Sequence, residues 1–171
     1  MDIQGTGHNV CHGIISSIHS RFPSQETKEP LKDIISNAGG AVTMAIGRIL
    51  VMDDEEIIRD VVSSMLDFLN YDVDLASDGT EAIEMYAEAQ QAGSPYDAII
   101  MDLSIPGGMG GKEAIKELMG IDPGITALVS SGYSNDPVMT DCSAYGFSGV
   151  VRKPFKLEEL REVLDRALRK D

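Results

Sequence analysis

Cysteine and long apolar runs are both scarce in this chain, and each scarcity limits the cellular compartments in which we expect the protein. Its two cysteines, Cys11 and Cys142, form neither a disulfide framework nor a metal-ligand spacing, so we expect reduced thiols in a cytosolic protein. No apolar run approaches the roughly 18 to 20 residues that a membrane-spanning helix needs. The first residues also lack the charged and apolar regions of a signal peptide. We therefore expect a cytoplasmic protein with no membrane segment.

Basic residues are half as common as acidic ones, 14 against 28, which gives a net charge of −14. Residues 1–47 carry three basic and four acidic side chains, so the remainder carries 11 basic and 24 acidic ones. Because DNA phosphates repel such a domain, we predict no direct nucleic-acid binding. The simplest role of this negative charge is to keep the domain soluble.

Histidine is absent after position 19. His8, His12 and His19 all lie in residues 1–47, which we interpret as an N-terminal extension or linker, partly helical or disordered. A phosphodonor histidine among them is a weaker hypothesis than a solvated histidine without a function. The absence excludes imidazole acid–base catalysis for residues 48–171 and leaves carboxylates as the nucleophiles.

From Arg48 onward, apolar runs alternate with segments of helical period. Short Ile/Val/Leu runs are typical of strands buried on both faces, and apolar residues spaced by three and four indicate amphipathic helices. The expected strands cover 48–52, 73–76, 96–101, 125–130 and 148–152; the expected helices cover 55–69, 78–91, 111–119, 137–145 and 157–168, the fourth being weak. This alternation predicts an α/β domain over 48–171: a flavodoxin-like, doubly wound five-stranded parallel sheet, order 2-1-3-4-5, with five helices.

Polar residues fall where these strands end. Asp53 and Asp54 follow the first strand, Asp102 the third, Ser131 the fourth and Lys153 the fifth. Because the carboxyl ends of parallel strands share one edge, we expect these side chains to converge there. Three crowded carboxylates repel one another, so without a cation at least one pKa should rise. Mg²⁺, which prefers about six oxygen ligands, would relieve that repulsion.

Such a site suits phosphoryl transfer to a carboxylate. Asp102 can attack phosphorus in line while the metal and Lys153 neutralise the phosphoryl oxygens, which gives an acyl phosphate. Ser131 can donate a hydrogen bond to one of those oxygens. We expect the Lys153–Pro154 bond to aim the amine at the site, and a cis peptide fits there. An Asp-Asp pair alone more often caps a helix; the shared position of the polar residues carries the prediction.

The glycine-rich segment before Lys112 is not a phosphate loop. A Walker A motif needs glycine at position 106 and serine or threonine at 113, where this chain has Pro106 and Glu113. We interpret the glycines of residues 107–111 as permitting a tight loop beside the site.

Over residues 48–170 the chain resembles the receiver domain of two-component response regulators. The resemblance rests on Asp53-Asp54, on Asp102 followed by Leu-Ser-Ile-Pro-Gly-Gly-Met-Gly-Gly, on Ser131 and on Lys153-Pro154-Phe155. It implies that Asp102 is the phosphoacceptor, that Ser131 is the switch hydroxyl and that Lys153 contacts the phosphate. It further implies that Asp53, Asp54, Asp102 and the backbone carbonyl of Ser104 hold Mg²⁺. Ser104 and Tyr133 fall where the family tunes dephosphorylation.

Two positions depart from that family. It often has tyrosine or phenylalanine three residues before the lysine, where rotation of the ring reports phosphorylation. Here that residue is Val150, and Phe147 lies three residues too early to replace it. A switch through aromatic rotation is therefore in question. Serine stands at position 131, where threonine is commoner, and keeps the hydroxyl.

The resemblance implies a signalling phosphoacceptor that catalyses only its own phosphorylation and dephosphorylation. Its partners would be a histidine kinase or its phosphotransfer domain and a downstream protein bound through roughly residues 134–169, with homodimerisation left open. The motifs also resemble receivers attached to hybrid sensor histidine kinases, although residues 1–47 are too short for a kinase domain. Two weaker alternatives are an aspartyl phosphatase resembling the haloacid dehalogenase family and an interaction module that has lost phosphorylation. The phosphatase family has a second aspartate where this chain has Ser104. A loss of phosphorylation is disfavoured because this chain retains every acceptor residue.

Overall fold

The computed structural model describes residues 44–132 and 135–169. The histidines and Cys11 of the predicted extension lie outside the described residues, as does Tyr133, so the boundary between residues 47 and 48 stays a prediction. Cys142 is a half-buried free cysteine. Within the described part of the chain, no helix has the length and apolar character needed to cross a membrane.

Five parallel strands form one sheet. They are β1 (Arg48–Met52), β2 (Asp72–Ala76), β3 (Ala98–Asp102), β4 (Ala127–Ser131) and β5 (Gly149–Arg152), in the order β2-β1-β3-β4-β5. The predicted topology is confirmed. The register sets Asp102 beside Ser130 and Ser131 beside Arg152, so the polar ends of three neighbouring strands are level.

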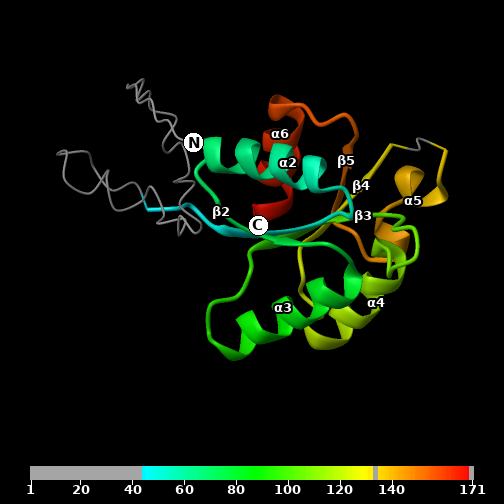
Figure 1. The fold of residues 1–171 in the computed structure, drawn as a ribbon, viewed down its shortest axis with the longest axis horizontal. Helices are drawn as coiled ribbons and strands as arrows, with labels where there is room; N and C mark the ends of the chain where they lie inside the picture. Colours follow the sequence, from blue (N-terminus) through cyan, green and yellow to red (C-terminus); the bar gives the residue numbers. More distant parts are fainter. Residues whose placement is uncertain (1–43, 133–134, 170–171) are drawn as a thin grey trace, which may run out of the picture. The chain divides into compact units, whose positions relative to one another are not determined.

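Helices cover both faces of the sheet (Figure 1). Helices α2 (Glu56–Phe68) and α6 (Leu157–Leu168) lie on one face, and α3 (Gly79–Gln91) and α4 (Gly111–Ile121) lie on the other. The shorter α5 (Pro137–Thr140) and the 3₁₀ turn η1 (Ser143–Tyr145) connect β4 to β5. The chain is therefore doubly wound, as the alternation of strands and helices predicts.

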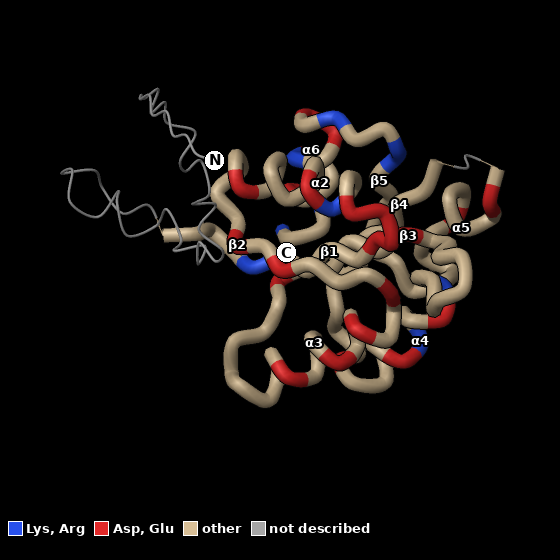
Figure 2. Tube along the Cα trace, viewed as in Figure 1, with Lys and Arg blue, Asp and Glu red and all other residues tan. Residues whose placement is uncertain are grey.

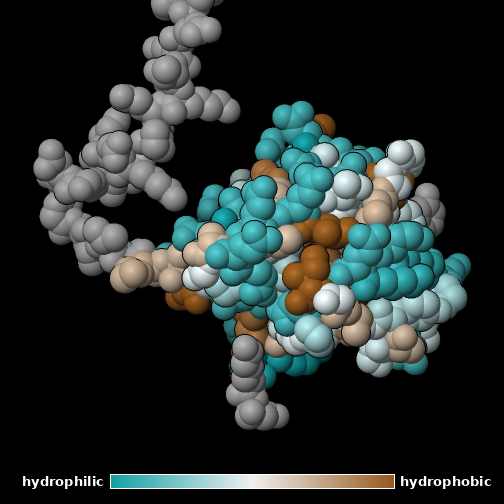
Figure 3. Space-filling model, turned by 90° about the horizontal axis from the view of Figure 1, so that it is seen from below, coloured by the Kyte–Doolittle hydropathy of each residue, from teal (hydrophilic) through white to brown (hydrophobic). Residues whose placement is uncertain are grey.

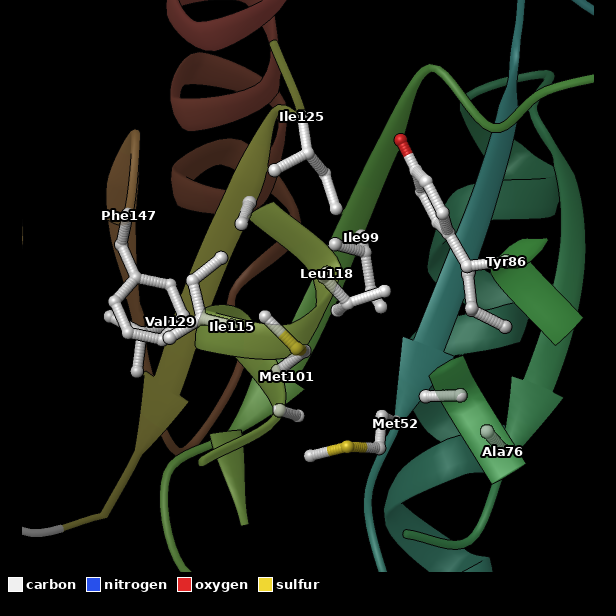
Figure 4. Close-up of a cluster of buried hydrophobic side chains, with 14 of the residues drawn as sticks. Met52, Ala76, Tyr86, Ile99, Met101, Ile115, Leu118, Ile125, Val129 and Phe147 are labelled. Carbon is white, nitrogen blue, oxygen red and sulfur yellow. The ribbon is translucent and has the colours of Figure 1, made fainter. Parts of the chain in front are cut away.

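Alternation along the strands divides the buried side chains between two cores. Leu50 and Met101 face α3 and α4, whereas Val51 and Ile100 face α2 and α6. In the first core, Phe147 and Val129 lie side by side at one end and Tyr86 lies at the other (Figure 4). The strands are therefore packed on both faces.

One face of the molecule is mostly hydrophilic. Seen from below, on the side of α3 and α4, polar residues cover most of the molecule around a central hydrophobic patch (Figure 3). Two further exposed hydrophobic residues, Ile57 and Phe68, lie on α2 at 76% and 77% exposure. The hydrophobic side chains of α2 therefore do not all reach the core.

The segment 137–145, predicted as one weak helix, is two short turns. Asp136 accepts a hydrogen bond from the Val138 amide at 2.9 Å and starts α5. Asp141 then accepts from the Ser143 hydroxyl at 2.9 Å and from the Ala144 amide at 3.3 Å, which starts η1. Aspartate competes for backbone amides in this way and so divides helices. Other bounds differ by one or two residues: β3 starts at Ala98, β4 ends at Ser131 and α4 reaches Ile121.

Candidate functional site

A cleft opens at the carboxyl edge of the sheet. Its volume is about 480 Å³, and it is lined by Asp54, Glu55, Asp102, Ser104, Pro106, Ser131, Gly132 and Lys153. Figure 2 shows acidic residues gathered where β1 and β3 end, beside the start of α2. Residues from four separate loops and strand ends thus meet in one place.

Asp53 and Asp54 take different positions although they are neighbours. Asp53 is 1% exposed, and its backbone amide donates to the Ala76 carbonyl at 3.1 Å, extending the ladder between β1 and β2. Its Oδ1 accepts from the Glu55 amide at 3.1 Å. Asp54 is exposed at the cleft. Asp53 still belongs to the ladder between β1 and β2, whereas Asp54 lies beyond it in the bend that leads to α2, which accounts for one buried and one exposed carboxylate.

Lys153 bridges the two buried carboxylates. Its Nζ lies 2.6 Å from Asp53 Oδ2 and 2.6 Å from Asp102 Oδ2. The backbone amide of Lys153 donates to the Ser131 carbonyl at 3.2 Å, and the Lys153–Pro154 bond is cis. The amine therefore lies against Asp102, and the end of β5 is held to the end of β4.

The pKa values of Asp53 and Lys153 are both raised. Burial raises the pKa of Asp53 above its usual value, and the hydrogen bond from Lys153 only partly offsets that rise. Repulsion from Asp102 also raises the Asp53 pKa, but it is the smallest cause. Burial opposes the charge of Lys153, yet its bonds to Asp102 and Asp53 outweigh burial and raise the Lys153 pKa. One ammonium is shared by two carboxylates, so the contact outweighs burial in setting the pKa of Lys153 but not that of Asp53. The predicted rise of a carboxylate pKa occurs, with burial rather than repulsion as its main cause.

The three carboxylates have the spacing of a metal site. One oxygen from each of Asp53, Asp54 and Asp102 lies within 4.8 Å of the other two. Mg²⁺ holds its oxygen ligands at about 2.1 Å in an octahedron, so two ligands lie about 3 to 4 Å apart. Asp54 is exposed, which leaves a side open for the water ligands that Mg²⁺ usually keeps. The donor set fits a hard divalent cation.

The glycines after Asp102 allow a close approach of backbone to backbone. A Cβ on Gly110 would lie 2.6 Å from the Leu103 carbonyl oxygen, and one on Gly111 would lie 2.8 Å from the Asp102 carbonyl oxygen. Lys112 Nζ binds Asp136 Oδ2 at 2.8 Å, which joins the start of α4 to that of α5. These contacts agree with a tight loop beside the site.

Gly110→Ala is expected to lower the free energy of unfolding by about 1 to 3 kcal/mol, because the added methyl group must displace backbone rather than a side chain. Gly120→Ala is the control: Gly120 lies within α4, the helix that Gly110 precedes, and a Cβ there has nothing within 4 Å. That change should stabilise the helix by up to about 1 kcal/mol. Urea unfolding of both variants measures the difference; equal stability of the two would contradict the packing described above.

Ser131 and Val150, the two positions that the sequence resemblance connects with switching, lie in different surroundings. Ser131 ends β4, borders the cleft and is 5% exposed. Val150 is half-buried beside Val129, and Phe147, 2% exposed, packs in the same core from the loop before β5. The side chain at position 150 is therefore core packing, and the nearby aromatic ring belongs to the core as well.

Two residues that contribute to the site were not predicted from the sequence. Glu55 lines the cleft and gives its amide to Asp53. Arg59 Nη1 donates to the Asp53 carbonyl at 2.6 Å. The available signal was a cation in the first turns of a helix, where the helix dipole disfavours positive charge.

Comparison with known proteins gives consistent matches. The family described as response regulator receiver domain matches residues 49–165. The chain is similar to the chemotaxis protein CheY of Thermotoga maritima, with 30% identity over 120 residues covering 70% of this chain and 95% of that protein. A similar solved structure is the receiver domain of a sensor histidine kinase from Pseudomonas aeruginosa, with magnesium ion coordinated in its active site cleft. Its TM-score is 0.63 at 28% identity, over 72% of this chain and 98% of that one.

Some relatives are much longer than the matched region. Regulatory protein AtoC of Escherichia coli is 28% identical over 124 residues, which are 72% of this chain and 26% of that protein. The chain thus spans about a quarter of this relative, and the similarity concerns one domain of it.

Proposed function

Because this chain belongs to the response regulator receiver domain family, we propose that it accepts a phosphoryl group from a histidine kinase onto Asp102 and so switches its affinity for another protein. The observation that carries the proposal is the contact at 2.6 Å between Lys153 and Asp102, beside two further carboxylates in one cleft. Receiver domains act in two-component signalling, and histidine kinases are their partners.

Asp53, Asp54, Asp102 and the backbone carbonyl of Ser104 would hold Mg²⁺. The spacing of the three carboxylates supports this set, and Ser104 borders the same cleft. When bound, the ion supplies positive charge that neutralises phosphoryl oxygens. The burial that raises the Asp53 pKa makes this carboxylate costly to keep charged without a cation, which favours metal binding.

Asp102 acts as the nucleophile in this proposal. One carboxylate oxygen attacks phosphorus, an oxygen–phosphorus bond forms, and the bond from phosphorus to the donor imidazole nitrogen breaks as the imidazole leaves. Lys153 already touches Asp102 Oδ2 and would follow the charge onto an equatorial phosphoryl oxygen. Ser131, at the rim of the cleft, would donate a hydrogen bond to another. The product is an acyl phosphate that water can hydrolyse.

The output surface in this proposal comprises residues 134–169, of which 135–169 are described. It contains α5, η1, β5 and α6, and it joins the site through Lys153 and through the Lys112–Asp136 ion pair. Val150 offers no ring to rotate, so in this proposal the signal reaches the output surface through those two links rather than through an aromatic side chain. The similarity to the receiver of a sensor histidine kinase supports a second arrangement, in which the donor kinase is part of the same longer polypeptide.

Incubation of the full chain with Mg²⁺ and acetyl phosphate should add one phosphoryl group, seen as a mass gain of the intact protein. Asp102→Asn should abolish the gain, because an amide cannot form the acyl phosphate. Asp165→Asn, an exposed position on α6, should label like the unmodified chain. Equal labelling of Asp102→Asn, or no labelling of the unmodified chain, would contradict the proposal.

A further inference from the structure

The side chain of Arg59 binds the backbone of the buried turn after β1. Asp53 lies one residue beyond β1, where the strand ladder ends, and it is 1% exposed. Its amide is bound by the Ala76 carbonyl at 3.1 Å, and its carbonyl accepts from Arg59 Nη1 at 2.6 Å. A buried backbone carbonyl needs a donor, and here a guanidinium supplies it with a short, charge-assisted hydrogen bond.

Helix geometry explains why position 59 supplies that donor. Arg59 is the fourth residue of α2, and long helical side chains point back toward the helix N-terminus. The guanidinium therefore reaches over the first turn to the end of β1. The side chain is half-buried. Hydrogen bonds from Ser77 lower the pKa of Glu81, at the start of α3, and the charge of Arg59 adds a small contribution.

We infer that Arg59 is a positioning residue for the cation site: it fixes the Asp53 backbone so that the carboxylates of Asp53 and Asp54 point toward Asp102. The inference rests on the proposed function, since it concerns the same three carboxylates. Arg59 itself binds a carbonyl and takes no ligand. Groups that hold metal ligands in place typically change metal affinity by about 10- to 100-fold when they are removed.

The charge of Arg59 predicts the opposite effect from its hydrogen bond. As a cation near an acidic site it repels Mg²⁺, so removal of the charge alone would tighten binding. Loss of the hydrogen bond would instead loosen the turn and weaken binding. The sign of the change in Mg²⁺ affinity therefore separates a positioning role from a purely electrostatic one.

The test is a calorimetric titration of the metal-free full chain with Mg²⁺ alone. Arg59→Met should weaken Mg²⁺ binding about tenfold. Arg59→Lys keeps the charge but not the planar fork of donors. Its Mg²⁺ affinity should therefore fall between those of the unmodified chain and of Arg59→Met. Arg166→Met removes one exposed cation from the last turn of α6, a residue that does not line the cleft, and should leave the affinity unchanged.

A second readout separates positioning from general damage. At saturating Mg²⁺, labelling of Arg59→Met by acetyl phosphate should recover to within about twofold of the unmodified rate, since the acceptor and Lys153 are intact. Affinity of Arg59→Met equal to or tighter than that of the unmodified chain would overturn the inference, as would an equal loss in Arg166→Met. Failure of the unmodified chain to bind Mg²⁺ would instead overturn the proposed metal site itself.

Discussion

Lys153→Met is expected to bind Mg²⁺ more tightly than the unmodified chain while its phosphorylation rate falls by about a hundredfold or more. The two effects have one origin. The ammonium lies 2.6 Å from an oxygen of Asp53 and from an oxygen of Asp102, so it neutralises the same carboxylates that a cation would use. Its removal leaves three carboxylates to the metal alone. The phosphoryl group meanwhile loses its positive side-chain partner.

Calorimetric titration with Mg²⁺ and the initial rate of labelling by acetyl phosphate at saturating Mg²⁺ measure these two effects separately. Lys116→Met makes the same change on the exposed surface of α4 and should alter neither quantity. Weaker Mg²⁺ binding in Lys153→Met would show that the lysine organises the carboxylates rather than competing for them. An unchanged labelling rate would remove Lys153 from the proposed chemistry.

Asp53→Asn is expected to make the metal-free chain more stable near neutral pH and to weaken Mg²⁺ binding at least about tenfold. Burial raises the Asp53 pKa, so the folded chain holds this proton more tightly than the unfolded chain. The stability that this group contributes is complete below its ordinary pKa of 3.8 and is lost as pH rises through the raised value. An amide at this position carries no charge to bury.

Urea unfolding without metal, from acid to neutral pH, measures the effect. The difference in unfolding free energy between Asp53→Asn and the unmodified chain should widen as pH rises through the folded pKa of Asp53. Asp72→Asn removes the same charge from an exposed strand position and accounts for the relief of general repulsion in this acidic chain. A constant difference across that pH range, or equal stabilisation by both variants, would contradict a buried charge at position 53.

The sheet and its order followed from local patterns. Short apolar runs separated by amphipathic segments leave few ways to bury both faces of a parallel sheet, so the sequence predicts the order β2-β1-β3-β4-β5. The segment 137–145 was misjudged as one helix because its apolar residues have helical spacing. Two aspartates instead bind local amides and divide it, and such competition depends on geometry within a single turn.

The positions of Asp53, Asp54, Asp102, Ser131 and Lys153 at strand ends were also visible in the sequence, since strand period and strand order together place them on one edge. What each side chain contacts was not. The sequence could not say that Asp53 is buried while Asp54 is exposed, that Lys153 bridges Asp53 and Asp102, or that Arg59 holds the Asp53 carbonyl.

Periodicity and turn residues are local properties, so the sequence by itself determined the alternation of elements, the parallel sheet and the set of polar residues at its carboxyl edge. Burial, ion pairing and pKa shifts depend on distances between residues far apart in the chain. Asp102 and Lys153 are 51 positions apart, and their contact exists only because β3, β4 and β5 pack in register. Tertiary structure therefore decided which carboxylates share a cation and which charge the fold must bury.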